Sequence, residues 1–137
     1  MGKEGKKTEE IQDHLTLAEE CLDEAKNLLL SGLYRGTVSR AYYSMYHASM
    51  ALLLTKRIAP KKHAGVLRVL GLEFVNKGYI EEVYAESYKF ALDVRQKADY
   101  GVEFKIDKET AEEIVNSAEV FLRRVAKAID EIESRNE

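Results

Sequence analysis

Cysteine, proline and tryptophan are almost absent from this sequence. Its 137 residues include one cysteine, one proline and no tryptophan. A disulfide needs two cysteines and a cysteine-based zinc cluster needs several, so the single Cys21 excludes both within the chain. We expect Cys21 to be buried as a small apolar residue beside the apolar stripe of its helix. Pro60 falls in a basic stretch from Lys56 to Lys62, which we interpret as a loop.

An excess of positive charge and a membrane-length apolar run are also missing. Net charge is −3, with 33% charged and 45% hydrophobic residues, which is the balance of a soluble globular protein. No overall basic field would attract nucleic acid, so any RNA contact has to come from a local patch. The first seven residues, MGKEGKK, precede no apolar segment, so we expect no signal peptide, a cytoplasmic location and no membrane association.

The usual catalytic patterns are absent as well. The glycines are too scattered for a phosphate-binding loop, and the sequence contains neither HExxH nor a pair of ExxH sequences. The three histidines, His14, His47 and His63, do not have the spacing of metal ligands. We therefore predict no bound metal and no cofactor.

The segment from Tyr34 to Thr55 is apolar over most of its circumference, which predicts a central helix. At about 100° per residue, one broad face holds Val38, Ala41, Tyr42, Met45, Ala48, Ser49, Leu52 and Leu53. A second strip holds Tyr43, His47, Met50 and Leu54, and the narrow polar sector holds Arg40, Ser44 and Thr55. This is more apolar surface than the neighbours in a small bundle need, so we also expect a homodimer.

Four further helices are predicted from apolar repeats at spacings of three and four, near residues 8–31, 63–77, 80–98 and 107–133. Ser31-Gly32 ends the first, and Asp107 caps the last. The inward face of the fourth should hold Val83, Ser87, Phe90, Ala91 and Val94, with Tyr84, Tyr88 and Arg95 on its flank. Residues 98–106 are interpreted as a loop. The prediction is an all-α, five-helix, up-and-down antiparallel bundle in one domain, with its core at about 8–133 and short charged termini.

The sequence RQKADY, from Arg95 to Tyr100, contains the clearest candidate site residue. An arginine on the flank of an apolar face needs a partner for its charge. It could bind phosphate or RNA with bidentate geometry, or it could form a salt bridge with Asp99 near the end of the helix. Spacing alone favours the salt bridge.

Three weaker candidates also have two interpretations each. His47 could act at a site, although a lone histidine on an apolar face is more often hydrogen-bonded core. The tyrosines could stack on bases, although helical spacing favours core packing; they are Tyr42, Tyr43, Tyr46, Tyr84 and Tyr88. The basic residues near the end of the central helix form either a phosphate-binding patch or a solvated loop; they are Lys56, Arg57, Lys61, Lys62, His63 and Arg68.

Four segments together resemble the HEPN superfamily, in particular its small single-domain archaeal and bacterial branch. They are SRAYYSMYHASMALL, the HAGV that begins at His63, FVNKG at 74–78 and LDVRQKADY at 92–100. The similarity covers about residues 8–130. It implies a five-helix bundle that is usually homodimeric. Many relatives of this kind are toxins paired with a small nucleotidyltransferase of the MNT type, and several are metal-independent RNases.

The resemblance implies an RNase motif of arginine, four to six residues, then histidine. Arg95 matches the arginine, whereas Tyr100 stands where a histidine would be expected. Our first hypothesis is therefore a nucleotide- or RNA-binding, toxin–antitoxin-type module that acts with a nucleotidyltransferase partner. In it, Arg95 contacts phosphate, Asp99 orients Arg95, and Tyr100 is a hydrogen-bond donor or a target for nucleotidylation. Further ligand contacts would come from Arg40, Tyr43, Lys62 and His63.

Two alternatives remain open. The first is a metal-independent RNase toxin that uses Arg95 with Tyr100, or with His47 supplied by the central helix. The second is a purely structural bundle whose surface serves protein assembly.

Overall fold

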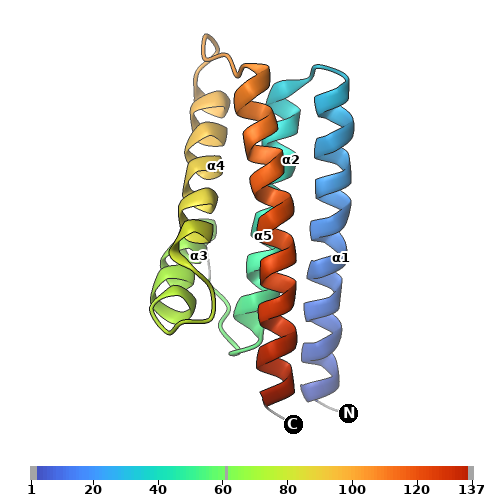
Figure 1. Ribbon diagram of the computed structural model, residues 1–137, viewed down its shortest axis with the longest axis vertical. Coiled ribbons are helices and arrows are strands. Elements are labelled where there is room, and N and C mark those ends of the chain that lie inside the picture. The colour runs from blue at the N-terminus through green and yellow to red at the C-terminus, as the bar shows by residue number, and fades with distance from the viewer. Residues whose placement is uncertain (1–2, 61, 136–137) are drawn as a thin grey trace.

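The computed structural model describes residues 3–60 and 62–135, and every regular element within them is helical. The elements are α1 (Lys3–Leu30), α2 (Tyr34–Leu54), α3 (His63–Val69), η1 (Leu70–Val75), α4 (Glu82–Tyr100) and α5 (Lys108–Arg135) (Figure 1). The short π-helical η1 continues α3, so the two form one bent third helix. The predicted all-α, five-helix fold is confirmed. No helix in the described residues is long and apolar enough to cross a membrane.

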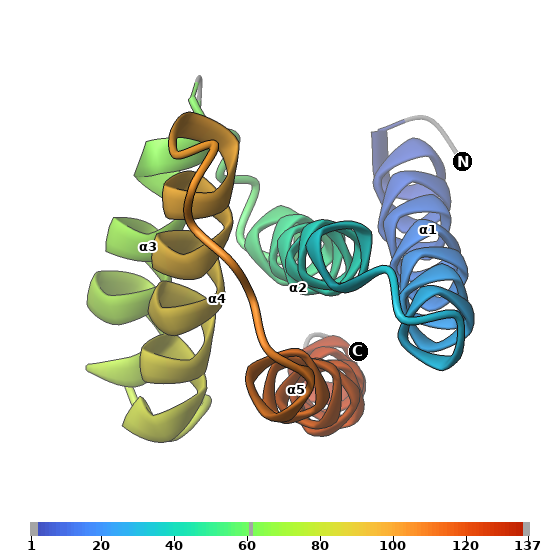
Figure 2. The same cartoon turned by 90° about the horizontal axis from the view of Figure 1, so that it is seen from above.

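The long central helix α2 has neighbours on three sides. Viewed along the bundle, α1, α5 and the α3–α4 pair surround it, and the side of α2 opposite α5 carries no described helix (Figure 2). In Figure 1, α1 and α4 run upward while α2 and α5 run downward. The third helix lies across the lower end of the bundle instead of along it. As predicted, α2 is central and its broad apolar face is buried.

The first helix begins at Lys3, five residues before the start we predicted at residue 8. Lysine and glutamate are good helix formers, so the charged stretch continues the helix beyond the packed region. Met1 and Gly2 lie outside the described residues. At the other end, Gly32 adopts a left-handed φ of 75°, and the Leu33 N–H donates to the Leu28 carbonyl at 2.9 Å. These features close the helix as the Ser31-Gly32 signal indicated.

The third helix changes its hydrogen-bond pattern within its length. After α3, the Asn76 N–H donates to the carbonyl of Gly71, five residues earlier, at 2.9 Å. This π-type turn was not predicted, because apolar spacing does not distinguish one extra residue in a turn. Lys56, from the end of α2, donates to the Glu73 carbonyl at 3.1 Å and lies 4.1 Å from the centroid of the Tyr79 ring. It therefore joins the end of α2 to η1.

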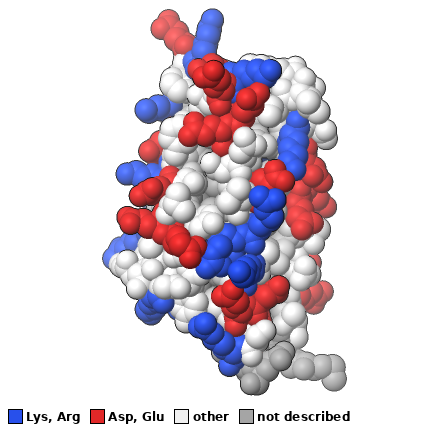
Figure 3. Space-filling model, viewed as in Figure 1, with Lys and Arg blue, Asp and Glu red and all other residues white. Residues whose placement is uncertain are grey.

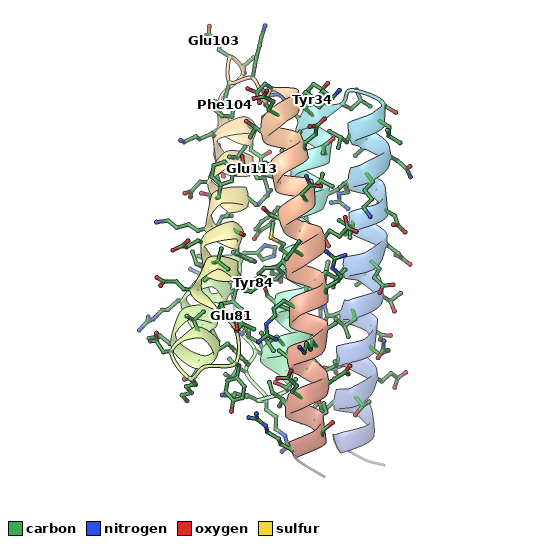
Figure 4. The ribbon with its side chains drawn as sticks, in the orientation of Figure 1. Tyr34, Glu81, Tyr84, Glu103, Phe104 and Glu113 are labelled. Atoms are coloured by element: carbon green, nitrogen blue, oxygen red, sulfur yellow. The ribbon has the colours of Figure 1, made fainter. Side chains whose placement is uncertain are left out.

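Arg35 in the first turn of α2 holds the connection between α4 and α5. Its guanidinium donates to the carbonyls of Ala98 and Phe104, and to those of Gly101 at 3.1 Å and Val102 at 3.3 Å. Carbonyls at the end of a helix lack partners within the helix, and Arg35 satisfies that of Ala98 near the end of α4 as well as those of the loop that follows. Phe104 and Tyr34 lie at this end of the molecule (Figure 4).

The last helix starts at the predicted cap. The Asp107 carboxylate accepts the Thr110 N–H at 2.8 Å, and this bond lowers the pKa of Asp107. The helix continues to Arg135, two residues past the predicted end.

Two details of the predicted core are wrong. Val83 and Phe90 are 54% and 43% exposed, whereas Tyr88, which we placed on the flank of α4, is fully buried. The hydroxyl of Tyr88 lies 3.2 Å from that of Tyr42, so each satisfies the other inside the core.

The narrow polar sector of α2 is largely buried. The Ser44 hydroxyl donates to the Ala18 carbonyl of α1 at 2.8 Å, and the Thr55 hydroxyl donates to the Leu52 carbonyl at 2.6 Å. The small Ser44 side chain is therefore satisfied within the contact between α1 and α2. Cys21 is buried as expected.

Candidate functional site

Several candidate residues meet where α2 faces α3 and α4. We call this group the aromatic–cation cluster; it comprises Arg40, Tyr42, Tyr43, Tyr46, His63 and Arg95. Three helices supply it, since α2 contributes four residues in consecutive turns, α3 contributes its first residue and α4 contributes the arginine. The cluster therefore depends on how the third and fourth helices pack against α2.

Arg95 lies across two tyrosine rings. Its guanidinium carbon is 5.0 Å from the ring centroid of Tyr42 and 5.1 Å from that of Tyr43, close enough for cation–π attraction. The expected ion pair is also present, with Asp99 Oδ2 at 3.3 Å from Arg95 Nη2. The Arg95 side chain is 22% exposed and Asp99 is 48% exposed, so the pair is open to solvent. A guanidinium has five N–H donors, and one carboxylate contact leaves donors for an incoming anion.

A second guanidinium shares the Tyr43 ring. The Arg40 guanidinium carbon is 5.1 Å from its centroid, and Arg40 Nη1 is 3.8 Å from Glu24 Oε1 and 3.9 Å from Cys21 Sγ on α1. Both arginines thus combine aromatic support, from one ring for Arg40 and two for Arg95, with one carboxylate contact. Tyr43 is the side chain that links the cation from α2 with the cation from α4.

His63 joins the cluster from the start of α3. Its ring stacks on Tyr46, with centroids 4.1 Å apart and 18° between the planes, and meets Tyr43 edge-on at 6.1 Å. Burial is the main cause that raises the pKa of Tyr46. His63 itself is exposed, as is the preceding Lys62. An imidazole is therefore held on the same tyrosines that support the arginines.

His47 pairs with a histidine of α1, although its ring also meets Tyr46 of the cluster edge-on, with centroids 5.2 Å apart. Its Nδ1 lies 3.1 Å from Nδ1 of His14, and the two rings are stacked with centroids 5.3 Å apart. Burial lowers the pKa of both histidines; in His47, nearby His14, Arg40 and His63 lower it further. For His14, the charges of Glu10 and Asp13 oppose the effect of burial. A hydrogen bond between two Nδ1 atoms requires that at least one ring be neutral.

Tyr100 does not join the cluster. It is the last residue of α4 and is 89% exposed. Five residues along a helix correspond to about 140° around its axis, so Tyr100 and Arg95 project in different directions. Tyr100 therefore does not lie beside the arginine with which it was paired in the RNase hypothesis.

The basic residues near the end of α2 do not form one patch. Lys56 contacts η1, as described above, whereas His63 contacts the tyrosines of α2. Arg68 borders a different groove, which is lined by Ile58, Pro60, Gly65, Val69, Leu72 and Glu73. Lys61 lies outside the described residues. In the part of the chain that is described, no three His, Cys, Asp or Glu side chains are arranged to hold a metal ion.

Sequence reasoning missed two roles. The pairing of His14 with His47 and the carbonyl contacts of Arg35 each join residues far apart in the sequence. No local spacing signals such contacts.

Comparison with known proteins gives matches along nearly the whole chain. The family model described as "HEPN domain" matches residues 11–129. A Methanocaldococcus jannaschii protein with the name "Putative toxin MJ0605" is 50% identical over 124 residues, covering 90% of this chain and 92% of that protein. "Putative toxin MJ0142" of the same organism is 39% identical over 118 residues, covering 86% and 80%. A "UPF0332 protein" of Thermotoga maritima is 34% identical over 115 residues, covering 84% and 87%.

The lowered pKa values of His14 and His47 predict a stability that depends on pH. A histidine whose pKa is lower in the folded state stabilises the fold above its unfolded value, about 6.5, and this stability is lost as the pH falls. We expect the free energy of unfolding, from urea titrations, to decrease between pH 7.5 and pH 5. The double substitution His14→Gln/His47→Gln should flatten this decrease; an unchanged slope would show that other groups cause it.

Proposed function

The chain belongs to the HEPN domain family, and from this premise we propose that it is a toxin–antitoxin-type module that binds RNA or a nucleotide at the aromatic–cation cluster. The observation that carries the proposal is the position of Arg95, whose guanidinium lies over Tyr42 and Tyr43 with only a solvent-open contact to Asp99. Two relatives carry "Putative toxin" in their names, which supports the toxin-type role.

The chemistry of the cluster suits a phosphate that carries a base. A guanidinium can bind two phosphate oxygens at once, and Arg95 and Arg40 supply two such groups beside one ring. Tyr43, Tyr46 and His63 supply planar rings of the kind on which bases of single-stranded RNA stack. Because the whole chain carries a net charge of −3, this local arrangement has to provide the attraction.

Binding should depend on Arg95. Charge-assisted hydrogen bonds contribute about 1.5–3 kcal/mol, so Arg95→Ala should weaken the binding of a labelled single-stranded oligouridylate by roughly ten- to a hundredfold. Fluorescence anisotropy without metal measures this. Arg123→Ala is the matched control, because it removes the same charge from an exposed position on α5 that pairs only loosely with Glu119, at 3.9 Å. Equal affinity of the Arg95 and Arg123 variants would leave Arg95 as a structural ion-pair residue.

The same samples separate binding from catalysis. We expect little or no RNA cleavage by the wild-type protein, because Tyr100 replaces the motif histidine and proton transfer at neutral pH contributes about a hundredfold or more to such rates. Cleavage created or raised by Tyr100→His would indicate an intact groove that lacks only its acid–base group. Efficient wild-type cleavage that Tyr100→Phe or His47→Gln abolishes would instead support the RNase alternative.

We also propose a nucleotidyltransferase partner that modifies Tyr100 in the cytoplasm. The hydroxyl-bearing ring of Tyr100 is 89% exposed at the end of α4, where Arg35 holds the following loop in place. A modifying enzyme could therefore reach it without unfolding the bundle. Incubation with ATP and a nucleotidyltransferase of the MNT type should add the mass of a nucleotide to this protein, as seen by mass spectrometry. Tyr100→Phe should remove the addition, whereas Tyr34→Phe should retain it; labelling that persists in Tyr100→Phe contradicts this assignment.

The last part of the proposal is a homodimer that forms through α4 and α5. The second strip of α2 is only half-buried, but the more exposed apolar side chains lie elsewhere, with Val83, Phe90 and Val120 each more than 40% exposed. A groove of about 290 Å³ includes Val83 and Val120 and is lined by Val83, Tyr84, Ser87, Asn116, Ser117 and Val120. On this face, an uncharged area lies between side chains of both signs (Figure 3), and Tyr84 marks it between α4 and α5 (Figure 4).

A second copy of the chain would cover this uncharged area with its own. Light scattering at micromolar concentration should therefore give twice the chain mass of 15.6 kDa. Val120→Lys should produce monomers, because it places a charge in the covered area. Leu17→Lys, at an exposed apolar position on α1, is the control and should remain dimeric. A wild-type protein of 15.6 kDa would contradict the dimer.

A further inference from the structure

The charges around the two arginines of the cluster balance. Arg40 has Glu24 at 3.8 Å and Arg95 has Asp99 at 3.3 Å, so two guanidinium groups face two carboxylates. With neutral imidazoles, these two arginine–carboxylate pairs sum to a formal charge of zero. An anion that approaches the Tyr43 ring therefore meets guanidinium donors whose charge is balanced by carboxylates. One additional positive charge would make this sum positive.

His63 is the group placed to supply that charge. It stacks on Tyr46 and meets Tyr43 edge-on, and Tyr43 is the ring that both arginines contact. The residue is exposed, so a ligand can reach its nitrogens. Histidine is also the side chain whose charge most readily changes near neutral pH. His47 is less accessible to a ligand than His63, because it is half-buried and its Nδ1 faces His14.

The charged and titratable groups around His63 come from every neighbouring helix. From α2 come Arg40, Tyr43, Tyr46 and His47, with His14 of α1 behind His47; Lys62 precedes it in the chain, and α4 contributes Arg95 and Asp99. A bound phosphate favours a positive charge on His63, so phosphate binding and proton uptake should promote each other.

We propose that phosphate binding at the aromatic–cation cluster is linked to the protonation of His63. The two arginine–carboxylate pairs carry no net charge, and the imidazolium of His63 supplies the positive charge that attracts the phosphate. The proposal rests on the proposed function, since it concerns a ligand held at Arg95. It gives the site a regulatory property, because a fall in pH strengthens binding of the same ligand.

The test measures affinity against pH. The probe is a labelled oligouridylate without terminal phosphates, because its internal phosphodiesters do not titrate in this range; anisotropy is recorded from pH 5.5 to 8 in EDTA. For the wild type, Kd should fall as the pH is lowered, by up to about tenfold per unit for one linked proton. His63→Gln should bind weakly with no pH dependence, and His63→Arg should bind tightly with none. His47→Gln should keep the wild-type slope.

Circular dichroism at each pH confirms that the variants remain folded. A full wild-type slope in His63→Gln overturns the proposal, and so does a slope that disappears in His47→Gln. If Arg95→Ala weakens binding while His63→Gln matches the wild type at every pH, only this inference fails and the proposed function stands. If the wild-type protein does not bind the probe, or Arg95→Ala binds equally well, the proposed function fails and the inference fails with it.

Discussion

The burial of α2 is the constraint on which the rest of the structure depends. Its broad face packs into the core, and the small residues Ala41, Ser44 and Ala48 are fully buried where neighbouring helices approach. Such a helix has no fully solvated side on which to place charge, yet it carries Arg40 and His47. The chain accommodates the arginine with an aromatic ring and a loosely held carboxylate, and the histidine with a second imidazole on α1.

The burial of α2 also determines the surroundings of Arg95, which α4 places against it. Where α4 packs against α2, the guanidinium of Arg95 lies over the rings of Tyr42 and Tyr43. A fully buried carboxylate in place of these rings would instead form a neutral ion pair with the arginine, closed to solvent. The tyrosine rings hold the charge without neutralising it, and Asp99 remains half-exposed. Tertiary packing thus leaves two arginines supported and still able to accept an anion. The groups that stabilise the helix contacts are the same groups that give the surface its chemistry.

The helices that sequence predicts well are those with local signals. Apolar repeats define α1 and α5, Gly32 supplies the left-handed residue after α1, and Asp107 caps α5. The errors occur where a distant partner decides the outcome. Tyr88 is buried where its hydroxyl meets that of Tyr42, and near the end of α4 the Ala98 carbonyl accepts a hydrogen bond from Arg35 of α2. Neither partner is visible from the spacing within α4.

The candidate site divides in the same way. The pair Arg95–Asp99 follows from i,i+4 spacing, and Arg95 matches the arginine of the family's motif. The motif also directed attention to Tyr100, five residues on, whereas the fold brings an imidazole to the arginine's ring from the start of α3. A sequence motif identifies residues that are close along one helix. It does not identify the side chains that a second helix brings to the same site. The short third helix, which lies across the bundle, is therefore the element that completes the cluster.

The size of the cluster limits what it can recognise. Two guanidinium groups that share one tyrosine ring can contact one or two phosphates, not an extended backbone. A protein that follows a long nucleic acid neutralises many phosphates and needs a basic surface to do so. This chain carries a net negative charge, and Lys56 is directed toward η1 instead of the ring cluster. Recognition at this site would thus depend on the fixed geometry of a few rings and cations, which makes the packing of α3 and α4 against α2 part of the specificity.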